Sequence, residues 1–63
     1  MEAYQERVVE EREQLGAKID KLGSFVSSDV FKTVDDAEQK RLRRQLTIMQ
    51  QYLQVLNERI AEF

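Results

Sequence analysis

The second half of the chain carries an unbroken heptad pattern of apolar residues. Between residues 42 and 63 these residues recur in alternating steps of four and three. That spacing places them on one side of a helix and is typical of a coiled-coil seam, which must pack against another helix. We therefore expect a helix over about residues 36–62. The seam residues are Leu42, Leu46, Met49, Leu53, Leu56, Ile60 and Phe63.

A weaker helical pattern in the first half predicts a helix over about residues 3–26, with one thin apolar stripe. The turn between the two helices, about residues 27–35, is rich in Ser, Thr and Asp, which favour caps over helix interiors. Thr33 or Asp35 could cap the second helix, and Glu38 could complete a capping box with Asp35. We expect Phe25 and Phe31 to fold inward at this end. The fold class predicted for the single domain of residues 1–63 is all-α: an antiparallel two-helix hairpin with a short capped turn.

The length of 63 residues limits the hydrophobic core that one hairpin can bury. Chains this small usually need disulfides, a metal or self-association, and this chain has no Cys and no His. A second apolar stripe, Ile48, Tyr52 and Val55, flanks the seam. It indicates a subunit interface, an apolar wall of a pocket between subunits, or a wider buried face. We expect the hairpins to assemble into a homo-oligomeric helical bundle. The predicted interface residues are Leu46, Ile48, Met49, Tyr52, Leu53, Val55 and Leu56.

The composition also limits the chemistry. Without Cys or His there is no thiol nucleophile, no imidazole base and no usual transition-metal ligand, so we expect no enzyme, catalytic residue, metal or cofactor. The net charge of -2 argues against nucleic acid as a partner. No apolar run approaches the roughly 20 residues of a membrane span, and we expect a cytoplasmic protein.

A basic cluster lies at the start of the second helix, with four cations in residues 40–44. It is either an anion pocket, in which Arg guanidinium groups bind phosphate, or a solvated face that balances nearby acids. Tyr4 and Tyr52 suit either a stacked base or an ordinary interface. Gly16 and Gly23 mark either a close approach or a tolerated exposed position. The candidate ligand-binding residues are Tyr4, Lys18, Arg41, Arg44, Gln45, Tyr52 and Arg59.

A resemblance to a known group of proteins is carried by Arg7-Val8-Val9-Glu10-Glu11, Leu15, Lys18-Ile19, Lys21-Leu22, Phe25, Phe31, Ala37-Glu38-Gln39, Leu42, Gln45-Leu46, Met49, Tyr52, Leu56 and Arg59-Ile60. With these residues the chain resembles small helical-hairpin proteins of tailed phages, and the resemblance covers nearly the whole sequence. This group of phage proteins includes anti-defence proteins that sequester the cyclic nucleotide signals of CBASS and Thoeris immunity. It implies a homo-oligomer (a hexamer in that group) that binds a cyclic di- or trinucleotide or a cyclic ADP-ribose-type ligand in the host cytoplasm without cleaving it. The alternative is a phage interaction module that docks an apolar helix face on a host protein.

Overall fold

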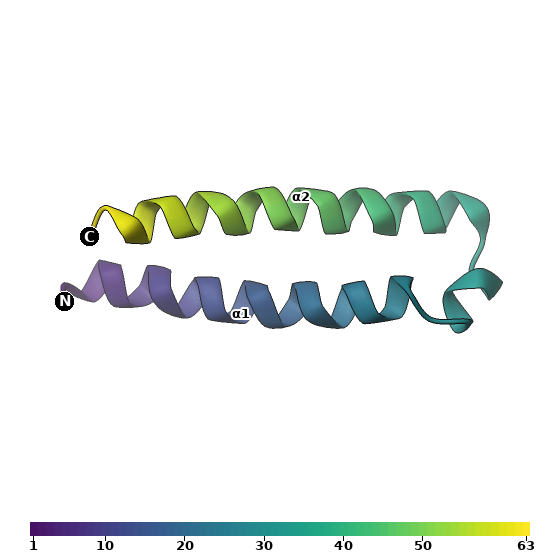
Figure 1. Cartoon of the computed structure of the whole chain (residues 1–63), viewed down its shortest axis with the longest axis horizontal. Helices are drawn as coiled ribbons and strands as arrows, with labels where there is room; N and C mark the ends of the chain where they lie inside the picture. The colour runs from purple at the N-terminus through teal and green to yellow at the C-terminus, as the bar shows by residue number, and fades with distance from the viewer.

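The chain folds as two long helices that lie side by side. In the computed structural model, which describes residues 1–63, α1 spans Ala3–Val26 and α2 spans Asp36–Ala61, with a 3₁₀ helix, η1, over Val30–Thr33 between them. Figure 1 shows the helices antiparallel, both termini at one end and η1 at the other. The predicted all-α hairpin is confirmed, and its assembly into a homo-oligomer stays a prediction.

The molecule is a rod that measures 45 × 14 × 13 Å. Its radius of gyration is 14.4 Å, whereas a compact domain of this length has one of about 10.6 Å. Two helices offer one line of mutual contact, so only four side chains are buried. These are Val8, Leu15, Phe31 and Leu56.

The core follows the seam of α2. Leu56 is fully buried against Val8 and Leu15 of α1. Half-buried side chains from both helices extend this cluster along the rod. They are Ile19, Met49, Leu53 and Ile60.

The closed end of the hairpin is filled by one aromatic side chain. Phe31 is 2% exposed, and its backbone N–H donates to the Ser28 hydroxyl at 3.4 Å. Phe25 contacts the Phe31 ring edge-to-face, at 5.7 Å between centroids, and remains 37% exposed. The Arg43 guanidinium lies over the Phe31 ring, 5.0 Å from its centroid. Only Phe31 is buried at this end as expected, while Phe25 covers the edge of its ring and stays partly exposed.

The start of α2 is capped by Asp35, whose carboxylate accepts from the Ala37 N–H at 3.2 Å. Thr33 is not the cap, since its hydroxyl donates to the Val30 carbonyl at 2.6 Å. Glu38 does not complete a capping box; it pairs with Arg41 at 2.8 Å. Asp36 and Glu38 still place negative charge near the positive end of the helix dipole.

Neither helix is long and apolar enough to cross a membrane.

Candidate functional site

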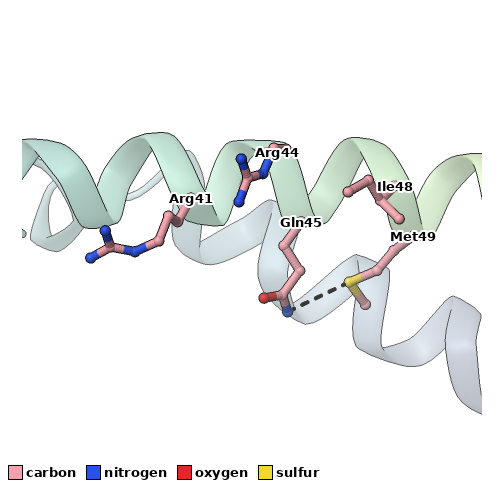
Figure 2. A pocket seen from close by; sticks show the side chains of 5 residues that line it. All are labelled: Arg41, Arg44, Gln45, Ile48 and Met49. Carbon is pink, nitrogen blue, oxygen red and sulfur yellow. Dashed lines mark hydrogen bonds between the residues drawn. The ribbon is translucent and has the colours of Figure 1, made fainter.

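A shallow open hollow of about 340 Å³ lies on α2, close to its N-terminal end. Its volume is at the lower end of the roughly 300–1,000 Å³ typical of small-molecule sites. All its lining side chains come from three successive turns of α2, as Figure 2 shows. They are Arg41, Arg44, Gln45, Ile48 and Met49.

Two guanidinium groups make one part of the hollow positive. Arg41 donates from Nε to the Glu38 carboxylate at 2.8 Å, which fixes its orientation and offsets part of its charge. Arg44 has no carboxylate within 4.0 Å and no hydrogen bond. A guanidinium with free donors is the usual ligand for a phosphate oxygen. Arg44 is therefore the strongest anion-binding group of the hollow.

The other part of the hollow is apolar. Ile48 is 54% exposed, and Met49 extends from α2 on the side of α1. Gln45 donates to the Met49 sulfur at 3.8 Å, which holds the amide beside the thioether (Figure 2). Methionine sulfur and branched carbon chains suit the face of an aromatic ring. The hollow thus joins two cations to a small apolar wall.

The outer stripe, defined as Ile48, Tyr52 and Val55, continues from this wall along α2. Its side chains are 54%, 43% and 49% exposed. The Tyr52 hydroxyl donates to the carboxylate of Glu11 on α1. This hydrogen bond fixes the ring of Tyr52 between the helices and leaves much of it open to solvent.

The structure brings together three of the seven candidate ligand-binding residues. Arg41, Arg44 and Gln45 line the hollow. Tyr4 lies at the open end of the hairpin, where its ring contacts Phe63 edge-to-face at 5.9 Å. The other three do not line the hollow within one chain. They are Lys18, Tyr52 and Arg59.

The predicted interface residues divide between two sides of α2. Leu56 is fully buried within the chain, and Met49 and Leu53 pack against the same core. Leu46 is half-buried on the seam. Of these four side chains only Leu56 is fully covered within the chain, and the role of the others in an interface stays a prediction. The outer stripe is the part of the prediction that remains available.

Helical spacing placed Ile48 on the same side of the helix as Arg44 and Gln45, and the hollow brings these residues together. Sequence reasoning missed Met49 as a lining residue and two further contacts. It did not pair Tyr52 with Glu11, because that contact depends on the register between the helices. It also did not place Arg43 over Phe31, because η1 sets that position.

The fold and this hollow define a small helical-hairpin protein with a partly cationic surface hollow. Residues 2–62 match the Sequestin family, and the chain belongs to that family. It is 46% identical over 63 residues, 100% of this chain and 98% of the relative, to the "Uncharacterized 7.5 kDa protein in denB-rIIB intergenic region" of Enterobacteria phage T4. No solved structure shows a significant match. The chain is thus a small phage-type protein of the Sequestin family.

Proposed function

We propose that the protein binds and sequesters a cyclic nucleotide immune signal of the infected host without cleaving it. The observation that carries this proposal is the Arg44 guanidinium, unpaired and exposed, in a hollow that also offers an apolar wall. A cyclic nucleotide presents the matching chemistry, since its phosphates are anionic and its bases are flat and apolar on both faces. The name of the Sequestin family supports the sequestering part of the proposal.

The geometry supports an orientation for the ligand. The phosphates lie at Arg41 and Arg44, and a base lies toward Ile48 and Tyr52. Tyr52 is eight residues beyond Arg44, about 12 Å along the helix axis. The Glu11 carboxylate at the Tyr52 hydroxyl would repel a phosphate there, which favours the base at this end.

Binding without chemistry is proposed because the lining side chains include no group able to act as a nucleophile or general base. The hollow offers two guanidinium groups, an amide, a thioether and an alkyl chain. Arginine stays protonated and the other groups do not exchange protons near neutrality. A released ligand should therefore be chemically intact.

The test is calorimetry of the protein against a panel of cyclic di- and trinucleotides and cyclic ADP-ribose isomers. We expect saturable binding of at least one member, which is recovered unchanged by chromatography after heat denaturation of the protein. Recovery of cleaved products would contradict sequestration.

Arg44→Glu should weaken binding at least tenfold, because it replaces a phosphate ligand with a repelling charge. Arg7→Glu is the matched control, since it makes the same charge change at an exposed position of α1 near the open end, away from the hollow, and should have a much smaller effect. Arg43→Glu is a poorer control because Arg43 packs on Phe31.

Tyr52→Ala should weaken binding by about 1–3 kcal/mol if the ring stacks on a base. Tyr52→Phe keeps the ring and removes only the hydrogen bond to Glu11, so it should retain most of the affinity. If no panel member binds, the alternative of a module that docks the outer stripe on a host protein takes precedence.

A further inference from the structure

Gln45 lies between the two chemically different parts of the hollow. The cations Arg41 and Arg44 precede it along α2. The apolar side chains Ile48 and Met49 follow it, as Figure 2 shows. Steps of three and four residues keep this order along one helix face. The hollow therefore presents positive charge, then an amide, then an apolar wall.

The Met49 sulfur determines which end of the Gln45 amide faces away from the wall. Gln45 Nε2 donates to that sulfur at 3.8 Å. A thioether accepts a hydrogen bond but has no proton to donate, so the reversed amide would place two acceptors against each other. The carbonyl oxygen Oε1 therefore points away from Met49 (Figure 2). No group of the chain donates a hydrogen bond to this oxygen.

A free carbonyl oxygen beside two guanidinium groups matches a ligand with two different functions. The guanidinium groups of Arg41 and Arg44 only donate hydrogen bonds, so they bind an anion. The Oε1 atom of Gln45 only accepts, so it binds a donor. The matching ligand carries a hydrogen-bond donor close to its anionic group.

We propose that Gln45 recognises the ribose hydroxyl next to the phosphate of a bound nucleotide, and that Met49 is the positioning residue for Gln45. The inference rests on the proposed function, because it takes over the orientation of phosphate and base given there. In a ribonucleotide the sugar joins the phosphate to the base, and its free hydroxyl lies on the carbon next to the one that carries the phosphate. The order of phosphate, sugar and base thus matches the order of cations, amide and apolar wall along α2.

The other donors of a nucleotide match Gln45 less well. In the proposed orientation the base lies toward Ile48 and Tyr52, and its N–H groups lie on the edge turned away from the sugar. A phosphate diester has no proton to donate near neutrality. The ribose hydroxyl is the remaining donor within reach of both Arg44 and Gln45. The hollow should therefore prefer ribonucleotides to deoxyribonucleotides, since the hydroxyl is what distinguishes them.

Nuclear magnetic resonance titration with two mononucleotides tests this recognition. Adenosine 3′-monophosphate carries a 2′-hydroxyl beside its phosphate, and 2′-deoxyadenosine 3′-monophosphate lacks it. We expect the ribose form to bind about three- to tenfold more tightly, the effect of one neutral hydrogen bond. The side-chain amide signals of Gln45 should shift more with the ribose form than with the deoxyribose form.

Gln45→Leu should remove the preference, because it deletes the acceptor and leaves the two cations in place. Both mononucleotides should then bind with the affinity that the deoxyribose form has for the parent protein. Gln54→Leu is the matched control, since it makes the same change at an exposed position of α2 outside the hollow. It should keep the preference for the ribose form.

Met49→Leu tests the positioning role. Leucine keeps an apolar side chain of similar volume but cannot accept from Gln45, so the amide is free to turn. The preference should fall below about twofold. The affinity for the deoxyribose form and the helical signal in circular dichroism should stay the same. Equal weakening of both mononucleotides would show a merely structural role for Met49 and overturn this part of the proposal.

Three results would overturn the recognition of the ribose hydroxyl. The first is equal binding of the two mononucleotides to the parent protein, and the second is no binding of either at millimolar concentration. The third is a preference that survives Gln45→Leu, which would assign it to another residue.

Failure of this inference can be told apart from failure of the proposed function. A preference for adenosine 3′-monophosphate without binding of any cyclic nucleotide in calorimetry would overturn the sequestration of a cyclic signal and leave the role of Gln45 intact. Cyclic nucleotide binding together with equal binding of the two mononucleotides would leave the proposed function intact and overturn the role of Gln45.

Discussion

The two sides of α2 are both apolar, yet only one of them is covered. The seam side holds Leu56, which is fully buried, while Val55, the preceding residue, is 49% exposed. Adjacent residues on a helix point about 100° apart. Val55 and Leu56 therefore lie at nearly the same position along the axis of α2 but on different sides of it. The difference shows that the one partner helix of a hairpin covers one stripe of α2 and leaves the outer stripe largely exposed to solvent.

The largest expected effect comes from a charge on the covered side. Leu56→Asp buries an unpaired carboxylate, which costs several kcal/mol against a total stability of about 5–15 kcal/mol. We expect it to remove most of the helical signal in circular dichroism. An unchanged melt would mean that the core lies elsewhere.

Val55→Asp is the control for that substitution, because it places the same charge on the open side. It should keep more helicity than Leu56→Asp. It should also abolish the dependence of the melting temperature on protein concentration, which a self-associating parent shows.

A smaller contrast of the same kind exists at the closed end. Phe31 is 2% exposed and Phe25 is 37% exposed. Phe31→Ala should destabilise the hairpin by about 3–5 kcal/mol, because it leaves a cavity and removes the ring under Arg43. Phe25→Ala should cost clearly less, because the Phe25 ring is already partly exposed and loses less burial together with its edge-to-face contact. Equal losses in urea unfolding would show that the two rings share the burial.

Substitutions of the glycines in α1 test whether a second copy of the chain contacts that helix. An added Cβ at Gly16 or Gly23 meets nothing within 4 Å in the single chain. Gly16→Ala and Gly23→Ala should therefore each stabilise the hairpin by up to about 1 kcal/mol through helix propensity. Destabilisation that grows with protein concentration would instead show that a second copy approaches α1 at these positions.

The smallest expected effect is that of pH on ligand binding. The chain has no His, and arginine stays protonated throughout the ordinary range. Affinity in calorimetry should be nearly constant between about pH 6 and 8. A steep change in this interval would show that a titrating group takes part in the site.

The sequence was sufficient to predict the fold, because the spacing of apolar residues indicates both helices. The steps of four and three from Leu42 to Phe63 predict a helix with one covered side. The segment rich in Ser and Asp predicts the turn at which the chain reverses direction. The choice between Thr33 and Asp35 as the cap was not decided by the sequence, because either oxygen suits the position. The structure resolves it, since η1 engages the Thr33 hydroxyl.

The candidate site was predictable only where it lies on a single helix. Arg41, Arg44 and Gln45 meet because three- and four-residue spacing on α2 brings them together. Tyr4 and Lys18 were grouped with them across the hairpin, and that grouping depends on how many residues the turn uses. Periodicity within each helix carries no information about this register. The sequence therefore did not predict that Tyr4 contacts Phe63.

The cluster of Phe31, Phe25 and Arg43 at the closed end also has a consequence for the order of folding. A loop of about ten residues closes in roughly 10–100 ns, and the entropic cost of closure rises with loop length. We therefore expect contacts around η1 to form early in folding, before the contacts near Tyr4 and Phe63. In the native state we expect amide hydrogens to exchange fastest near the two termini, where helix ends fray, and more slowly along the seam.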